Sequence, residues 1–443
     1  MQHPSPPLRN LSLGRLALPI FFEIFLHYAS LMINTYMVAR HSNYLVGSMG
    51  VGNQIFDLFI TIFSFLSIGC SIIIAQALGA RKHALAQDAL HQSLSLNFLI
   101  GLVCGAGIFI FGDTLLRLLQ TPQDLFVQAS YYVKTLALCL TLESLSITLA
   151  SILRVYNLAH LVTLSSLAMN LISILGNYYV LNHTQLELLG IGLATIIGRI
   201  ALIIMLVLIL IYRAQIRLRV RGFCTFGREV LGKILHIGSF SAGENLLWIV
   251  QYTIAFSFVN QLGSVQTSVQ TIYFQISLFI MLLGQAISMA NEIIIGKLVG
   301  AKRLSLAYKH TWRVLKIGFG ASLFVALVSF FARDFTMETL DLLPALQSVM
   351  LPLFALSIVL ETGRSFNVII VCALRASGDA RFPFFSGLVF MFGVSLPLGY
   401  MLCFSAGLGI VGVWIGFCAD EWLRGLVHAY RWRSKKWQNK ALL

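Results

Sequence analysis

Apolar runs long enough to cross a lipid bilayer recur along almost the whole chain of 443 residues. A helix needs about 20 mostly apolar residues to span the hydrocarbon core. We identify twelve such runs, at about residues 16–38, 46–76, 88–112, 125–150, 160–182, 190–212, 234–259, 267–298, 312–333, 344–372, 383–405 and 409–430. The chain is 58% hydrophobic and 11% charged, so its polar side chains cannot cover a soluble globule of this size. The sequence therefore predicts an all-α integral membrane protein with twelve transmembrane helices.

Lys and Arg are divided unevenly between the two sets of loops. Most of the 31 basic residues fall on the side that also receives both ends of the chain. The opposite side has only Arg40, Arg117, Lys134 and Arg333. Cytoplasmic loops carry an excess of Lys and Arg, so we expect both termini in the cytoplasm of a multi-pass cell-membrane protein, in the bacterial inner membrane. The same placement explains the net charge of +14 without nucleic-acid binding.

The chain aligns with itself at an offset of 221 residues. Gly79-Ala80-Arg81-Lys82 falls on Gly300-Ala301-Lys302-Arg303, Glu23 falls on Glu244, and Arg154 falls on Arg375. Each repeat holds six spans, so the two halves have the same orientation, as in parallel repeats related by an axis along the membrane normal. We expect an N-terminal six-helix lobe at 1–212, a cytoplasmic basic linker at 213–233, a C-terminal six-helix lobe at 234–430 and a cytoplasmic basic tail at 431–443.

Polar side chains at membrane depth are the candidate site residues, because a charge at mid-helix costs about 2.5–3.5 kcal/mol or more and seldom faces lipid. In the first span, Glu23, His27, Ser30 and Asn34 are spaced by 4, 3 and 4 residues, which places them on one face of a helix. Glu23 could exchange a proton, with His27 tuning it. The alternative is that Glu23 only joins neighbouring helices.

The second half repeats this face with Glu244, Trp248 and Gln251. Trp248 could present its ring to an organic cation, or it could pack between helices. Two further carboxylates, Asp57 and Glu143, are candidates for the lining of a substrate cavity, although Asp57 could instead lie at the outer interface.

Glu361 and Arg364 are three residues apart and can form a structural ion pair. The alternative for Glu361 is to hold a cationic substrate. Glu292, Asp420 and Glu421 complete the acids that we place at membrane depth.

Several segments resemble the multidrug and toxic compound extrusion (MATE) family. The clearest are residues 360–367 (LETGRSFN), 374–383 (LRASGDARFP) and 407–415 (GLGIVGVWI), and the first half adds 52–55 (GNQI). The resemblance covers nearly the whole chain. It implies a V-shaped pair of six-helix lobes that exports organic cations or drugs, driven by inward flow of Na⁺ or H⁺.

The resemblance also implies a cation site in the first lobe, to which the positions of Asn177 and Thr195 contribute. One departure concerns Asn34, which stands where many members of the family have an acidic residue. An Asn can ligate a cation but cannot carry a proton at physiological pH. The candidates for coupling are therefore Glu23, His27, Asn34, Asn177 and Thr195, with no metal site beyond a possible Na⁺ site.

These features favour a secondary active antiporter that exports amphipathic organic cations by alternating access. We find no phosphate loop and no catalytic motif, so we expect neither an enzyme nor a cofactor besides the coupling ion, Na⁺ or H⁺. The alternative is a lipid-linked oligosaccharide flippase of the same superfamily, which would need a cationic cavity. An intramembrane enzyme or a scaffold has less support. The expected partners are a small-molecule organic cation and membrane lipids, with the protein a monomer.

Overall fold

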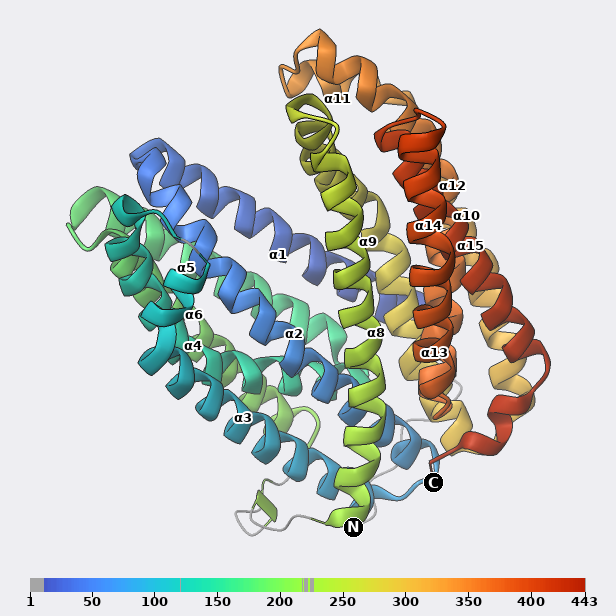
Figure 1. Ribbon diagram of the computed structural model, residues 1–443. Helices are drawn as coiled ribbons and strands as arrows, with labels where there is room; N and C mark the ends of the chain where they lie inside the picture. The colour runs from blue at the N-terminus through green and yellow to red at the C-terminus, as the bar shows by residue number, and fades with distance from the viewer. Residues whose placement is uncertain (1–11, 120, 217, 219–221, 224–226, 443) are drawn as a thin grey trace. The chain divides into compact units, whose positions relative to one another are not determined.

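The computed structural model describes residues 12–119, 121–216, 218, 222–223 and 227–442. Within these ranges the regular secondary structure is helical throughout (Figure 1). The first half contains α1 (Leu13–His41), α2 (Asn43–Gly79), α3 (His83–Leu118), α4 (Gln123–Val155), α5 (Ala159–His183) and α6 (Glu187–Tyr212). The second half contains α8 (Arg228–Asn260), α9 (Ser264–Gly300), α10 (Leu304–Phe331), α11 (Arg333–Thr339), α12 (Pro344–Ala376), α13 (Arg381–Phe390), α14 (Leu396–Tyr400) and α15 (Ile410–Arg433).

The predicted spans correspond to these helices. In the described part of the chain, ten helices are long and apolar enough to cross a membrane, and one of them, Arg381–Ser405, joins α13 and α14 through π-helical turns. The π turns Met391–Ser395 and Met401–Ser405 flank Pro397, which cannot donate a backbone hydrogen bond. The other two predicted spans are α8 and α15, which are 33 and 24 residues long but richer in polar side chains.

The chain divides into two compact units. The N-terminal unit holds Phe22–Ala77 and Lys82–Ser239, and the C-terminal unit holds Met1–Phe21, Leu78–Arg81 and Phe240–Leu443. The first turns of α1 thus belong to the C-terminal unit. The predicted linker also differs in its last residues, because α8 begins at Arg228 rather than at residue 234.

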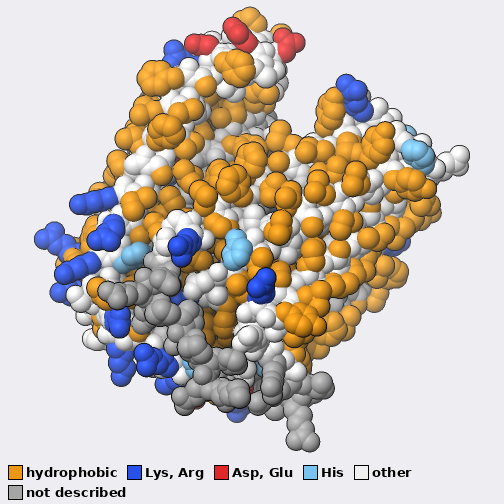
Figure 2. All heavy atoms as spheres, turned by 180° about the vertical axis from the view of Figure 1, so that it is seen from behind, with side chains coloured by type: hydrophobic (Ala, Val, Ile, Leu, Met, Phe, Trp, Pro, Cys, Tyr) orange, Lys and Arg blue, Asp and Glu red, His pale blue; other side chains and the backbone are white. Residues whose placement is uncertain are grey.

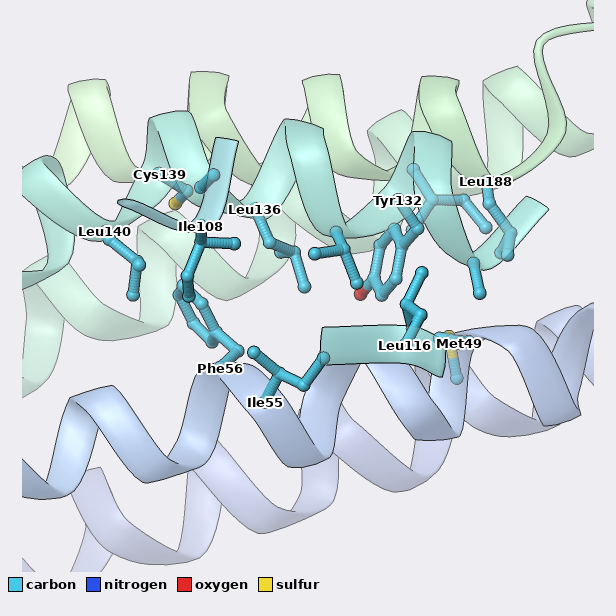
Figure 3. Packing of buried hydrophobic residues seen from close by; sticks show 14 of the residues in the cluster. Met49, Ile55, Phe56, Ile108, Leu116, Tyr132, Leu136, Cys139, Leu140 and Leu188 are labelled. Atoms are coloured by element: carbon cyan, nitrogen blue, oxygen red, sulfur yellow. The ribbon is translucent and has the colours of Figure 1, made fainter. Parts of the chain in front are cut away.

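An apolar core joins α2, α3, α4 and α6 in the N-terminal unit. Figure 3 shows Ile55 and Phe56 of α2 facing Ile108 of α3 and Leu136 and Leu140 of α4. The α4–α6 contact is close because Gly192 has no side chain, and a Cβ there would lie 2.5 Å from the side chain of Thr135. Small residues at such crossings permit tight packing where lipid supplies no hydrophobic driving force.

The C-terminal unit packs α12 between α9, α10 and α15. Its core includes Tyr273 of α9, Phe354 of α12 and Trp414 of α15. The rings of Phe354 and Trp414 each meet the ring of Tyr273 edge to face, with 5.0 Å between ring centres. Two glycines of α15 allow close approach to the π-helical span, since a Cβ on Gly416 would lie 2.7 Å from the carbonyl oxygen of Ser395.

Backbone geometry repeats between the halves. Arg81 and Lys302 occupy matching positions of the self-alignment, and both have left-handed backbone, with φ of 59° and 58°. Asn157 and Gly378 match in the same way, with φ of 64° and 98°. The turns that end α2 and α9, and those that end α4 and α12, therefore have the same form, which supports a duplication.

Apolar side chains cover much of the surface seen in Figure 2. Exposed examples include Phe324 at 67% and Phe331 at 75%. Exposing so many apolar groups to water would be unfavourable, whereas the acyl chains of a bilayer solvate them. In the C-terminal unit, acidic side chains gather at the end where α11 lies, and basic ones gather toward the other end.

Candidate functional site

The polar face of α1 meets α5 through a pair of amides. The Asn177 Nδ2 donates a hydrogen bond of 3.0 Å to the Oδ1 of Asn34. Asn177 is only 2% exposed, and its own Oδ1 is buried without a hydrogen-bond donor. Thr195 donates its hydroxyl to the carbonyl of Ile191 in its own helix, so it does not join this pair by a hydrogen bond. The structure therefore leaves a buried acceptor oxygen beside the position where an acidic residue was expected.

Glu23 does not stand alone on the same face. Its carboxylate accepts two hydrogen bonds from Arg154 of α4, at 2.5 and 3.1 Å, and both side chains are 14% exposed. Arg154 lies in the last turn of α4 and reaches back to α1. This ion pair favours the joining of helices over ion exchange as the role of Glu23. His27, one turn further along, is exposed and meets the ring of Tyr28 edge to face.

The second half contains the matching pair, in a looser form. Glu244 lies 4.0 Å from Arg375, the residue that aligns with Arg154. Arg375 also donates to Glu292 at 3.2 Å and is only 9% exposed. The structure buries both Arg375 and Glu292. The self-alignment held the signal for these pairs, since it matched both acids and both arginines.

Glu143 of α4 pairs with Arg199 of α6, with 2.6 Å between the guanidinium Nε and the carboxylate. Glu143 is 4% exposed. The two intramembrane residues thus neutralise each other, which lowers the cost of placing both at this depth.

Asp57 differs from every other acid that we place at membrane depth. Seven of them form ion pairs with arginine, namely Glu23, Glu143, Glu244, Glu292, Glu361, Asp420 and Glu421. In the described ranges of the chain, Asp57 has no such partner. Its side chain is exposed on α2, one turn from Asn53, which accepts a 3.0 Å hydrogen bond from Tyr132. An uncompensated carboxylate is therefore available on the surface of the N-terminal unit.

A second polar cluster lies inside the C-terminal unit. Glu361 is 1% exposed and accepts hydrogen bonds from Ser277 at 2.7 Å and from Arg364 at 2.8 Å. Arg364 also lies 3.5 Å from Glu421 of α15. The predicted Glu361–Arg364 pair is thus present as part of a larger network.

The network continues along α15. Asp420 pairs with Arg424 at 2.8 Å and accepts a hydrogen bond of 3.4 Å from Gln251, which also donates to Ser395 at 2.8 Å. Gln251 is 1% exposed, so this contact joins α8 to α15 inside the unit.

Sequence reasoning missed the last part of the network. His428 is fully buried, with its ring nitrogens bonded to Ser386 at 2.5 Å and to Asn367 at 2.7 Å. Asn367 donates in turn to Glu421 at 2.8 Å. The signal was present, because Glu421, Arg424 and His428 recur at intervals of three and four residues and so share one face of α15.

Aromatic rings line one small pocket of this unit. Trp248 stacks on Tyr252 at 6.0 Å, and Tyr252 meets Phe274 at 4.4 Å. The polar lining consists of Gln251, Arg364, Asp420 and Glu421. The ring faces are suited to contact with a cation, whereas Asp420 and Glu421 are already paired with arginines.

Comparisons with known proteins agree with the duplication. The MatE family model matches twice, over residues 19–179 and 241–401. An uncharacterized transporter, YisQ of Bacillus subtilis, is 32% identical over 99% of this chain and 97% of its own length. The probable multidrug resistance protein YoeA of the same organism is 23% identical over 90% of each chain.

The fold is shared with a solved structure of a MATE protein in the straight conformation. The TM-score is 0.88 at 17% sequence identity, with coverage of 96% of this chain and 95% of the other. At that identity the likeness establishes the fold alone. Together with the family model on both halves and the relationship to YisQ, it shows that this chain belongs to the MatE family of membrane transporters.

Proposed function

We propose that the protein is a secondary active antiporter that exports amphipathic organic cations by alternating access, in exchange for Na⁺ or H⁺. It would act as a monomer in the bacterial inner membrane, with both termini in the cytoplasm. The observation that carries the substrate class is Asp57, the one acid at membrane depth without an ion pair in the described ranges.

The energetics of an unpaired charge support this assignment. A carboxylate facing acyl chains would cost about 2.5–3.5 kcal/mol or more, so such groups face water or a counter-ion. The other seven acids have arginine partners, and a substrate would have to displace those partners to bind. No arginine has to be displaced from Asp57, so we assign Asp57 as the residue that binds the positive charge of an organic cation.

Aromatic rings offer the second kind of contact that such substrates need. Trp248, Tyr252 and Phe274 line the pocket of the C-terminal unit. Ring faces attract cations by about 0.5–2 kcal/mol each, and they also bind the apolar part of an amphipathic molecule. Within the C-terminal unit, these residues are proposed contacts for the apolar part of a substrate.

The Asn34–Asn177 pair supports Na⁺ as the coupling ion. The Asn177 Oδ1 is buried without a donor, and leaving such a group unsatisfied costs about 1–3 kcal/mol. A cation held by this oxygen, with Asn34 beside it and the hydroxyl oxygen of Thr195 on α6, would recover that cost. An amide cannot take up a proton at neutral pH, so H⁺ coupling would need another group.

The flippase alternative has little support. A pyrophosphate group would need unpaired cations inside a transport cavity, but Arg199 and Arg364 are neutralised by Glu143 and by Glu361 with Glu421. The proposed anchor has the opposite sign.

The test compares ethidium accumulation in cells that express the wild-type chain, D57N or D334N. Asp334 is an exposed acid of α11 and serves as the matched control. We expect the wild-type protein and D334N to lower ethidium accumulation, and D57N to lose this effect at an equal membrane level. Export by D57N at the wild-type rate would refute Asp57 as the anchor. Unchanged accumulation of a broad panel of cations with the wild-type protein would refute the proposed function.

A further inference from the structure

A row of cations lies on the outside of α10, apart from the site described above. Lys309, Arg313 and Lys316 are all exposed, and none forms an ion pair within the part of the chain that the structure describes. At 3.6 residues per turn, the three side chains fall within an arc of about 60°. Lys309 lies three residues before the predicted span at 312–333, and Arg313 and Lys316 lie in its first turns.

The same face of α10 becomes apolar further along. Ile317, Phe324 and Phe331 continue it, with exposures of 48%, 67% and 75%. A face that is apolar over its far half and cationic over its near half matches a lipid molecule, which has acyl chains at one end and a headgroup at the other. Long basic side chains can extend toward that headgroup while their stems remain against apolar surface.

Membrane topology alone does not explain this row. Its counterparts in the first repeat are Asp88, Gln92 and Ser95 of α3, none of which is basic. The basic turns before the two helices, with Arg81 and Lys302, are present in both repeats. A general requirement for cytoplasmic positive charge would act on both halves, so the row on α10 serves something specific to the second half.

The corresponding face of α3 is covered by protein at Gln92 and Ser95, whereas Asp88 is exposed. Ser95 donates a 2.9 Å hydrogen bond to the carbonyl of Phe223, and the ring of His91 meets that of Phe223 at 5.0 Å. Gly227 lies against Gln92 on the same face. In the described part of the C-terminal unit, Arg313 and Lys316, which replace Gln92 and Ser95, remain exposed. In the first repeat, protein therefore covers the positions of Gln92 and Ser95. In the second repeat, the matching cationic side chains are exposed.

Two buried nitrogen atoms beside the row lack hydrogen-bond partners. These are the Nε1 of Trp312 and the Nε2 of His310, and neither finds an acceptor or donor in the described structure. Trp312 lies three residues after Lys309 and four before Lys316, so it is their neighbour on the helix surface. An indole N–H can only donate a hydrogen bond, and the N–H of Trp312 finds no acceptor in the described structure.

We propose that this face of α10 binds the headgroup of an anionic phospholipid. The phosphate oxygens would accept from Lys309, Arg313 and Lys316, and the acyl chains would lie along Ile317 and Phe324. Basic pockets beside membrane helices suit such headgroups. The proposal is independent of the transported substrate, and it assigns a partner to a surface that the transport site does not use.

The test measures lipid retention on the purified full-length protein by native mass spectrometry, with phosphatidylglycerol and phosphatidylethanolamine added in turn. We compare the wild type with K309Q/R313Q/K316Q. The control, R81Q/K82Q/R213Q, removes three exposed cations that lie outside the row. We expect the wild type and the control to retain phosphatidylglycerol over phosphatidylethanolamine. Each cation contributes about fivefold to binding at an anionic surface, so the triple variant should bind at least tenfold more weakly.

Further arms keep the proposal open to refutation. K309R/R313K/K316R conserves the charge and should retain the lipid, so it replaces the triple variant if that protein fails to fold. Displacement of phosphatidylglycerol by inorganic phosphate at equal concentration would show a free-anion site instead of a lipid site. Equal loss in the R81Q/K82Q/R213Q control, or no loss in the triple variant, would overturn the proposal.

Discussion

The two repeat-related ion pairs predict unequal effects of the same substitution. Glu23 makes two close contacts with Arg154, at 2.5 and 3.1 Å, whereas Glu244 lies 4.0 Å from Arg375. E23Q would leave the Arg154 guanidinium without its carboxylate. E244Q would leave Arg375 with Glu292 at 3.2 Å. The first substitution should therefore destabilise the protein much more than the second.

The size of the effect follows from burial and geometry. Removing one partner of a fully buried pair costs about 3–5 kcal/mol. Glu23 and Arg154 each keep 14% exposure, so partial access to the surroundings reduces this to roughly 2–3 kcal/mol for E23Q. The long contact of Glu244 places E244Q below about 1 kcal/mol. The double variant E23Q/R154Q removes both charges and should recover most of the loss.

A thiol-reactive dye gives a built-in assay, because Cys70 and Cys139 of the N-terminal unit and Cys372 of the C-terminal unit are buried and react on unfolding. At about 2–4 °C per kcal/mol for a unit of this size, E23Q should lower the apparent melting temperature by about 4–12 °C. E244Q should shift it by less than about 4 °C. Equal shifts for E23Q and E244Q, or no recovery in the double variant, would refute the reasoning.

Three further predictions concern other parts of the molecule. G79A should destabilise the protein by about 1–3 kcal/mol in dye-monitored melting, because its Cβ would overlap the backbone carbonyl of Lys297. The control G320A should melt like the wild type, because its Cβ would have no atom within 4 Å. W437A removes a fully buried ring that stacks on Trp432 at 4.0 Å and should cost about 3–5 kcal/mol, so a melting curve like that of the wild type would contradict the packing. N34D places a carboxylate beside Asn177 and should make ethidium efflux from vesicles depend on pH between 6 and 8, unlike N182D, an exposed control on α5.

The helices and the duplication could be predicted from sequence because both are repeated signals. Each span is an apolar run whose length is dictated by the bilayer, and the self-alignment matched turns whose left-handed residues, Arg81 and Lys302, were later found in the structure. α8 begins at Arg228, six residues before the predicted span, because polar residues there also form helix, and hydropathy alone does not detect such a helix end.

Much of the site could not be predicted, since it depends on which faces of different helices meet. Helical spacing put Glu361 beside Arg364 within one helix, but it could not show that Arg154 reaches Glu23 across 131 positions. The same holds for His428, which is bonded to Asn367 of α12. The lack of a partner for Asp57 emerged only after the partners of the other acids were known.

The central claim is the exchange of an organic cation for an inward-moving ion, and purified protein in liposomes tests it directly. The vesicles are loaded with ethidium, an inward Na⁺ gradient is imposed, and the pH difference is held at zero with an ionophore. We expect ethidium to leave the vesicles at a rate that rises with the Na⁺ gradient. No movement of ethidium under a Na⁺ gradient or under a pH gradient, in vesicles that hold folded protein, would contradict the account.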